Sequence, residues 1–336
     1  MPRFDSVTAP GGITGNTEVA IRRRRRAVDA GPPPCFVAGT RILTARGEVA
    51  VEHLRAGDAL VLADGQTAPL VWLGHRRIDL RRHAHRDRDL PVLIEAGAIA
   101  DGMPRRDLML SPDHALYLEG HLIPAKVLIN GVTIRQVALD AVMYYHVELP
   151  VHAVVQAEGV PAESLRKTPT RAGFDNADGP LVLHPAFAPT RREMEGCAPV
   201  AVSGRIVERV RRRLLARTGI ITTSDPRLVI RRRADGAAII ESRSAIPGHI
   251  THDPRDCRRL GIKVATLTID GATLPLGHTA LTKGWHKPEA DGRWTDGAGV
   301  IPASLLSDSS EIAVTLAATL AYPLVGSAAQ PRHSAR

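Results

Sequence analysis

The stretch from Cys35 to Gly65 limits most strongly what this chain can fold into. It reads CFVAGTRILTARGEVAVEHLRAGDALVLADG: a cysteine, a Gly-Thr turn, and then short apolar runs broken by turn signals at Gly47, Gly57 and Asp64. Short apolar runs separated by glycine turns are typical of strands in an all-β unit. The segment therefore predicts a β fold that begins at the cysteine.

The same pattern continues to about residue 165 and returns in the last third of the chain. Aromatic residues make up only 3% of the sequence, so Val, Ile, Leu and Ala must fill the interior, which suits many short strands. The pattern predicts strands at 40–43, 59–62, 69–72, 107–110, 115–118, 132–134, 144–149, 153–157, 200–205, 228–232, 238–241, 262–269 and 312–320. Helical turns are expected at 51–54 and 94–99, a helix at 206–215 and an exposed loop or hairpin at 76–89.

The charge balance is basic, with a formal net charge of +9, and much of the excess lies in arginine runs. These runs are at Arg22–Arg26, Arg211–Arg213 and Arg231–Arg233. Runs of this kind can bind nucleic acid, but no aromatic residue is interleaved with them to stack bases. We expect solvated charge rather than a nucleic-acid site.

Cysteine usage and hydropathy argue against several other classes of protein. The three cysteines, Cys35, Cys197 and Cys257, are far apart and odd in number, so no disulfide framework is predicted. No CxxC or HExxH spacing is present, and we expect neither a metal nor another cofactor. No stretch is apolar enough to suggest a membrane span or a Sec-type signal peptide, which leaves the cytoplasm or a non-classical export route open.

Two further segments place reactive residues at the ends of predicted strands. LMLSPDHALYL, residues 108–118, carries Ser111 and His114 between two β runs, and residues 144–159 carry His152 after an alternating run. A cysteine thiolate can attack the carbonyl of the preceding residue, here Pro34, and convert the peptide bond into a thioester. That reaction needs a base for the thiol, a donor for the oxyanion and an acid for the departing nitrogen.

These three segments, in this order, resemble the Hedgehog/intein (Hint) domain of the bacterial type, over about residues 35–165. The resemblance implies a horseshoe-like all-β domain in which Cys35 is the nucleophile and His114 the acid. Ser111 stands where the family has threonine, as the oxyanion donor or an orienting hydroxyl, and His152 supports the site. Each segment alone also has an ordinary explanation: a buried cysteine, a Pro-Asp turn, or a structural histidine at a strand end.

The chain departs from splicing inteins at the end of this region. No His-Asn pair follows Gly159, and Asn176 lacks a preceding histidine, so splicing is not expected. The comparison favours a thioester that water or another nucleophile resolves, which releases the segment before Cys35 as the substrate. No region matches one that presents a sterol. Three aspartates, Asp79, Asp87 and Asp89, lie where the family's activating aspartate could fall.

Pro34 argues for a second interpretation. Its ring crowds the carbonyl that Cys35 must attack, which should slow the acyl shift. The alternative is therefore a catalytically inert Hint scaffold in a binding or surface-interaction protein. Its C-terminal β domain would then bind a protein or a glycan partner.

The C-terminal third contains a candidate glycan site in the segment 284–297. Trp285 and Trp294 lie on two predicted strands that meet at a Gly-rich turn, and Glu289 and Arg293 could bond sugar hydroxyls. The segment resembles one in β-sandwich modules of bacterial glycan-related proteins. Core packing of the two tryptophans in an aromatic-poor domain is the simpler explanation.

We therefore predict a mainly β protein in which a Hint-type all-β domain is followed by a smaller β-sandwich-like domain. The predicted organisation is a disordered Arg/Pro-rich arm at 1–34, the Hint-like domain at 35–165, a linker at 166–200, the sandwich-like domain at 201–325 and a flexible tail at 326–336.

Overall fold

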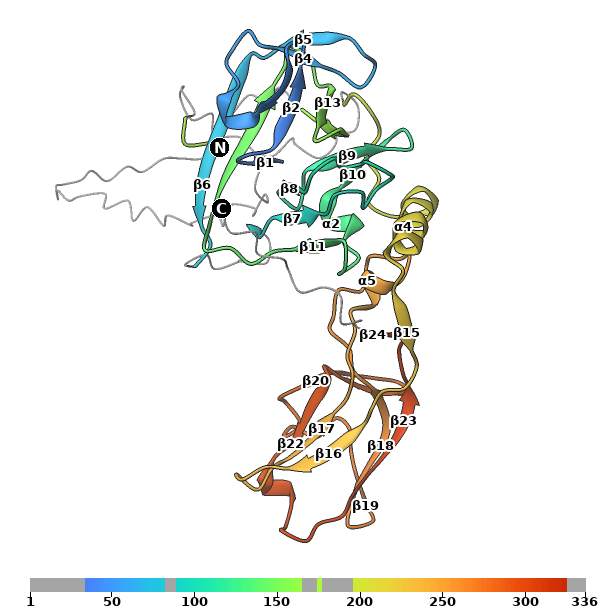
Figure 1. Ribbon diagram of the computed structural model, residues 1–336. Coiled ribbons are helices and arrows are strands. Elements are labelled where there is room, and N and C mark those ends of the chain that lie inside the picture. Colours follow the sequence, from blue (N-terminus) through green and yellow to red (C-terminus); the bar gives the residue numbers. More distant parts are fainter. Residues whose placement is uncertain (1–33, 82–88, 165–173, 177–195, 325–336) are drawn as a thin grey trace, which may run out of the picture. The chain divides into compact units, whose positions relative to one another are not determined.

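The computed structural model describes residues 34–81, 89–164, 174–176 and 196–324. The chain divides into two units, Met1–Ala30, which lies outside the described residues, and Gly31–Arg336. The second unit is mainly β, as predicted, with its strands in antiparallel sheets (Figure 1). Nearly all of the predicted arm, most of the predicted linker and all of the predicted tail lie outside the described residues.

A six-stranded sheet positions Cys35. The short strand β1 (Phe36–Val37) lies between β8 (Leu108–Leu110) and β12 (Ala141–Glu148). Cys35, the residue just before β1, therefore lies close to both of these neighbouring strands. The remaining strands of this sheet are β11 (Ile134–Gln136), β7 (Val92–Ile94) and, beside β12, β6 (Trp72–Asp79).

An eight-stranded sheet, whose strands alternate along the chain with groups of strands from the first sheet, carries the other site segments. Its central strands β9 (Ala115–Leu118), β14 (Val160–Glu163) and β13 (Val154–Ala157) pair in that order. The other strands are β10 (His121–Pro124), β2 (Arg41–Thr44), β3 (Gly47–Ala50), β4 (Ala59–Val61) and β5 (Thr67–Pro69). Aliphatic side chains of both sheets form one buried core, which also takes in Phe36.

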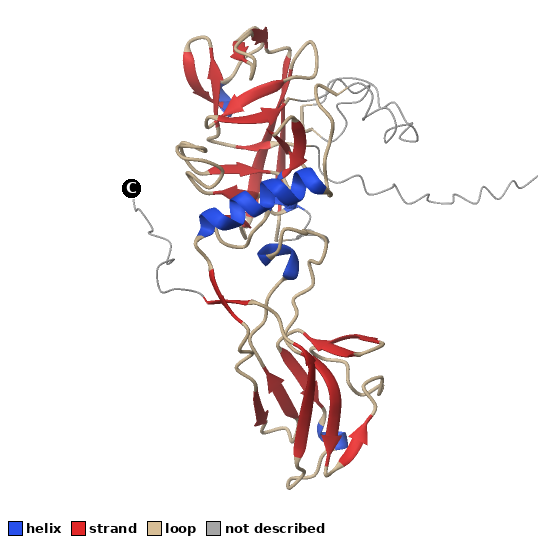
Figure 2. Cartoon of the chain, turned by 90° about the vertical axis from the view of Figure 1, so that its right-hand side faces the viewer, coloured by secondary structure: helices blue, strands red, loops and turns tan. Residues whose placement is uncertain are grey.

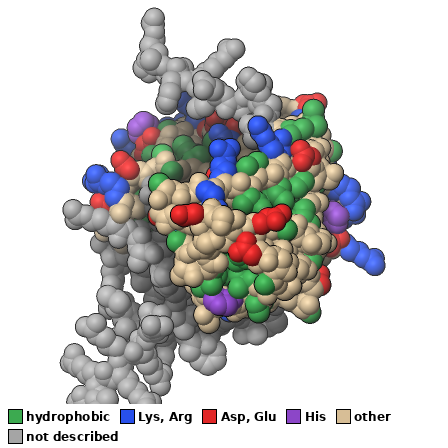
Figure 3. Space-filling view, turned by 90° about the horizontal axis from the view of Figure 1, so that it is seen from below, with side chains coloured by type: hydrophobic (Ala, Val, Ile, Leu, Met, Phe, Trp, Pro, Cys, Tyr) green, Lys and Arg blue, Asp and Glu red, His purple; other side chains and the backbone are tan. Residues whose placement is uncertain are grey.

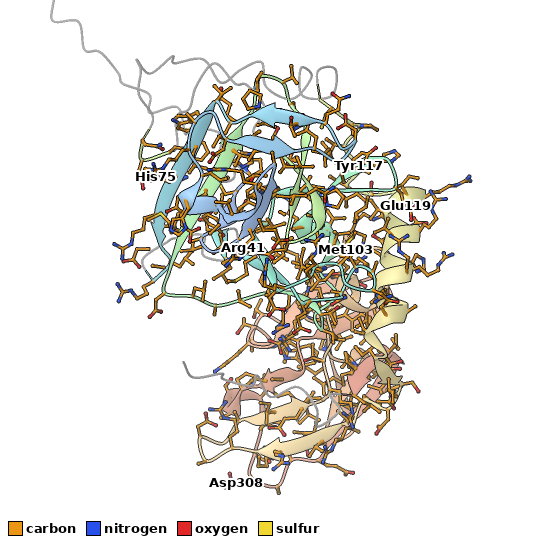
Figure 4. The ribbon with its side chains drawn as sticks, turned by 45° about the horizontal axis from the view of Figure 1, so that its top comes forward. Arg41, His75, Met103, Tyr117, Glu119 and Asp308 are labelled. Atoms are coloured by element: carbon orange, nitrogen blue, oxygen red, sulfur yellow. The ribbon has the colours of Figure 1, made fainter. Side chains whose placement is uncertain are left out.

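Two predicted helical features are confirmed. The turn η1 (Val51–His53) falls where one was expected, and α4 (Arg205–Thr218) covers the predicted helix at 206–215 (Figure 2). The apolar face of α4 joins the core of the two sheets through Val207, Val210 and Leu214. On its exposed side, Arg209 and Arg213 pair with Glu119, which lies beside α4 in Figure 4.

Arg211 departs from the prediction of solvated charge. Its neighbours Arg212 and Arg213 are exposed, but Arg211 is only 1% exposed. Its guanidinium donates to four main-chain carbonyls, those of Val127, Ile129 (3.0 Å), Gly248 and Thr251 (2.9 Å). Burial lowers its pKa to about 10. Arg211 thus stabilises the contact between α4, the C-terminal end of α2 (Ala125–Leu128) and the short helix α5 (Pro247–Ile250).

Further β sheets follow α4 and enclose a separate apolar cluster. A five-stranded sheet contains β18 (Lys263–Ile269), β19 (Ala272–Leu274), β20 (Trp285–Glu289), β21 (Gly292–Thr295) and β23 (Ile312–Ala318). A three-stranded sheet contains β16 (Val229–Arg232), β17 (Ala238–Glu241) and β22 (Ala298–Ile301), which is followed by the turn η2 (Ala303–Leu305). Strand β15 (Ile221–Thr223) pairs with β24 (Tyr322–Leu324).

The two tryptophans of segment 284–297 are buried, which favours core packing over a sugar-stacking surface. Trp285 belongs to the apolar cluster and donates from Nε1 to the Val300 carbonyl at 2.9 Å. Trp294 is 8% exposed. Arg293 is also buried, and its guanidinium is already bonded to main-chain carbonyls, so it has little capacity left for a ligand.

Several local predictions are wrong. Residues 200–205 form no strand, because α4 begins at Arg205. Residues 94–99 are not a helical turn, because β7 ends at Ile94 and Gly97 adopts a left-handed backbone (φ 75°). The segment 76–89, expected to be an exposed loop or hairpin, begins as the end of β6, and its residues 82–88 lie outside the described residues.

Charge on the visible surface is mixed. On the face shown in Figure 3, Lys and Arg side chains alternate with Asp, Glu and hydrophobic side chains rather than gathering in one patch. In the described parts of the chain, no helix is both long and apolar enough to span a bilayer.

Candidate functional site

Cys35 lies at the entrance to β1 and is almost completely buried, at 1% exposure. Phe36 and Val37 form the strand because an aromatic and a β-branched residue suit a pleated, buried surface. The Cys35 side chain packs in an apolar cluster with Ile78 and Tyr144. Burial raises the pKa of its thiol far above the usual range, and Arg76 offsets this only in part. At neutral pH the sulfur is therefore a protonated, weak nucleophile until a base acts on it.

Ser111 forms hydrogen bonds with both the N–H and the carbonyl of Cys35. The Cys35 N–H donates to Ser111 Oγ at 2.8 Å, and the Ser111 N–H donates to the Cys35 carbonyl at 2.9 Å. The Cys35 nitrogen is the amide nitrogen of the Pro34–Cys35 bond. Of the two roles that the resemblance implies for this hydroxyl, its position at the nitrogen fits the orienting one.

His114 is fully buried beside the same backbone. Its Nε2 lies 3.1 Å from the Glu163 carbonyl oxygen, which can only accept, so Nε2 carries the proton in the neutral ring. Its Nδ1 is buried and has no hydrogen-bond partner among the described residues. Burial lowers the pKa of His114, although the Glu163 carboxylate and the Cys35 main chain oppose this. The resting ring is thus neutral, with an acceptor nitrogen available.

His146 is a residue that the sequence analysis missed. It lies on β12, is fully buried, and its ring centroid is 5.1 Å from that of His114. Both of its nitrogens lack hydrogen-bond partners among the described residues, and burial, reinforced by His114, lowers its pKa well below the usual value. Strand β1 pairs Phe36 with Tyr145 and Val37 with Tyr144, so the same register extended by one residue sets Cys35 opposite His146.

His152 faces Glu163 and Cys197. Its Nε2 lies 3.6 Å from Glu163 Oε2, and its Nδ1 accepts the Cys197 N–H at 3.1 Å. Burial alone would lower the pKa of His152, but the Cys197 side chain and the Glu163 carboxylate raise it to about 9. Glu163 therefore connects His152 with His114, because its main-chain oxygen lies at the His114 ring and its carboxylate lies at the His152 ring.

Glu163 was not singled out in the sequence either, although it lies in the VPAESL ending. Burial alone would raise its pKa, but His152, His114 and the Ala115 N–H hold the pKa below its usual range. The Ala115 N–H donates to Oε1 at 2.8 Å. This carboxylate is thus ionised, and its strand β14 lies between β9 and β13, the strands that follow His114 and His152.

The candidate aspartates lie in different environments. Asp79 pairs with Arg81 at the exposed end of β6. Asp89 is buried, and its main-chain carbonyl accepts a hydrogen bond from the Tyr144 hydroxyl. Asp87 lies outside the described residues. Asn176 is used structurally, since its side chain bonds the main chain of His75 and Leu73 on β6. Within the described residues, no group of three or more His, Cys, Asp or Glu could hold a metal ion.

The region that contains this site matches a known protein family. Residues 34–169 match the model of the Hint domain. No curated protein matches the chain.

Several solved structures are similar over the same share of the chain. A bacterial intein-like domain from Clostridium thermocellum is 20% identical and covers 39% of this chain and 98% of its own, with a TM-score of 0.29. The MchDnaB-1 intein (N145AA) is 17% identical, with 39% and 99% covered and a TM-score of 0.29. A DnaB intein from Synechocystis sp. PCC 6803 is 9% identical, with 39% and 99% covered and a TM-score of 0.28.

Proposed function

Because this chain carries a Hint domain over residues 34–169, we propose that it processes itself by an N-to-S acyl shift at the Pro34–Cys35 bond. The product is a thioester whose resolution by water or another nucleophile releases residues 1–34 without splicing. The observation that carries this proposal is the contact set at the leaving nitrogen. There the Cys35 N–H bonds Ser111 Oγ, and the buried ring of His114 lies beside the Cys35 backbone.

In the first step the Cys35 thiol loses its proton and its sulfur attacks the Pro34 carbonyl carbon. His146 is the proposed acceptor, because the strand register sets it opposite Cys35 and its nitrogens are unpartnered among the described residues. The proton then passes to the adjacent Nδ1 of His114, whose Nε2–H stays on the Glu163 carbonyl. The cost of ionising a buried thiol is thereby shared between two imidazoles.

In the second step the C–N bond breaks as His114 returns that proton to the Cys35 nitrogen. Ser111 Oγ holds the N–H of this nitrogen, which fixes the direction of the developing lone pair. The products are a Pro34 thioester on Cys35 and a free α-amine, and both imidazoles are neutral again. Glu163 and His152 hold the His114 ring in place, which is the supporting role proposed for His152.

The rate of this reaction is expected to change little with pH near neutrality. Both imidazoles have lowered pKa values, so they remain neutral bases at and somewhat below pH 6.5 and become protonated only in more acidic solution. The release of residues 1–34, measured by mass at saturating hydroxylamine, should vary less than about twofold between pH 6.5 and 8 and fall toward pH 5. A rate that rises about tenfold per pH unit would instead indicate attack by a free thiolate without these bases.

A second candidate function is an inert Hint scaffold within a binding protein. The burial and raised pKa of the Cys35 thiol favour it, together with the crowding by Pro34. In that case the partner, a protein or a glycan, would bind the sheets after α4. A full-length mass that persists through prolonged hydroxylamine treatment would support this candidate over the first.

A further inference from the structure

A short segment that follows the region matched to the Hint domain lies against the outer edge of β6, the last strand of the six-stranded sheet. The His75 N–H donates to Asn176 Oδ1 at 3.0 Å, and the Arg77 N–H donates to Asp175 Oδ2 at 2.8 Å. In return, the Asp175 N–H donates to the His75 carbonyl at 2.8 Å, and Asn176 Nδ2 donates to the Leu73 carbonyl at 2.8 Å. The segment therefore covers an edge whose N–H and C=O groups would otherwise be open to water or to another strand.

Phe174, the first described residue of this segment, is buried in the apolar cluster that contains Cys35. Its ring packs edge-to-face on Trp72, with the centroids 5.2 Å apart and an interplanar angle of 88°. It also takes up the space over Gly74, because a Cβ added there would come within 2.8 Å of the Phe174 ring. Gly74 pairs with His146, the residue that the strand register sets opposite Cys35. Phe174 therefore closes the sheet beside the nucleophile and its proposed proton acceptor.

Covering the edge of β6 does not by itself account for this arrangement. The four hydrogen bonds of Asp175 and Asn176 would cover the strand with any side chain at position 174. The residue there is aromatic, it is 8% exposed, and a glycine on β6 leaves room for it. The ring belongs to the same cluster as a thiol that is only 1% exposed, so it helps to exclude water from that thiol.

We propose that residues 174–176 form a clasp that shuts solvent out of the Cys35 site, so that a nucleophile reaches this site only when the clasp lifts. Its role toward the thioester rests on the proposed acyl shift. When the clasp is open, water adds to the Pro34 carbonyl carbon, the C–S bond breaks, and the proton that the water loses goes to the Cys35 sulfur. When it is closed, the thioester is protected from hydrolysis. Opening breaks four hydrogen bonds and exposes one aromatic ring, which is a local rather than a global unfolding.

The test measures how fast the Cys35 thiol is alkylated in the full chain. The parent protein carries Cys197→Ser and Cys257→Ser, so that Cys35 is its one cysteine. The probe is N-ethylmaleimide, and the readout is the intact mass of the uncleaved chain. Phe174→Ala should raise the rate at least about tenfold, whereas Phe174→Leu, which still fills the space over Gly74, should stay within about threefold of the parent. Equal rates for Phe174→Ala and the parent would overturn the proposal.

A second pair of variants distinguishes release of the clasp from general loosening of the domain. Asn176→Ala removes two hydrogen bonds of the clasp and should raise the alkylation rate at least about threefold. Asn130→Ala is the matched control, because Asn130 is also largely buried and its Oδ1 accepts two main-chain N–H groups beside β11, at the opposite edge of the same sheet. It should leave the rate unchanged. Equal acceleration by the two alanine variants would overturn the proposal.

Release of residues 1–34 separates this proposal from the acyl shift itself. Without hydroxylamine, Phe174→Ala with all three cysteines in place should release the segment at least about threefold faster than the wild-type protein. If no variant releases it but Phe174→Ala still speeds alkylation, the acyl shift fails and the clasp stands. If hydroxylamine cleaves the protein and Phe174→Ala does not speed release by water, the clasp does not control resolution of the thioester and the proposal fails.

Discussion

Replacing His114 by Asn slows the release of residues 1–34 by about a thousandfold, if this imidazole returns the proton to the leaving nitrogen. Amide nitrogen leaves only when protonated, and His114 Nδ1 is the buried nitrogen beside the Cys35 backbone that has no other partner among the described residues. The rate is measured from intact masses over time at saturating hydroxylamine, so that resolution of the thioester does not limit it.

Loss of the acid must be distinguished from loss of the fold, because His114 is fully buried. His53→Asn, at an exposed histidine, is the matched control and should process at the wild-type rate. His114→Gly leaves space for a small base, and added imidazole should restore part of its rate. Wild-type processing in a folded His114→Asn protein would exclude His114 as the acid.

Replacing Arg211 by Met should lower the free energy of unfolding by about 3 kcal/mol, since carbonyls at two sites in the chain lose their donor in a buried place. Methionine keeps much of the apolar stem, so the loss reports on the hydrogen bonds rather than on a large cavity. Urea unfolding, followed by circular dichroism, measures the change.

The adjacent arginine supplies the control for this second prediction. Arg212 is on the same helix but exposed, and Arg212→Met should change the free energy of unfolding by less than about 0.5 kcal/mol. Equal effects of the two substitutions would contradict the structural role of Arg211. They would indicate that the run at 211–213 acts through its net charge.

Local patterns predicted much of the secondary structure. The strands at 115–118 and 238–241 and the helix at 206–215 were found because their apolar periodicity is complete within a few residues. Strands β10 and β14 were missed, and each contains a proline, Pro124 or Pro161, a residue that usually counts against a strand. Strand β6 was partly missed because its Arg and His residues resemble an exposed loop.

The site was less accessible from sequence than the fold. Cys35, Ser111 and His114 lie in segments with recognisable patterns, and the structure brings them together. His146 and Glu163 join them through strand pairing, and no short motif reports which residue lies opposite another across a sheet. Similarly, the burial of Arg211 depends on α4 packing against distant carbonyls, whereas a run of arginines in sequence indicates only exposed charge.

The central claim is that Cys35 attacks the Pro34 carbonyl, and the intact mass of freshly purified protein tests it most directly. Wild-type protein and Cys35→Ala are compared with and without hydroxylamine. The account predicts a species that begins at Cys35, that increases with hydroxylamine and that is absent from Cys35→Ala. An unchanged full-length mass under both conditions, or the same cleavage in Cys35→Ala, would contradict it.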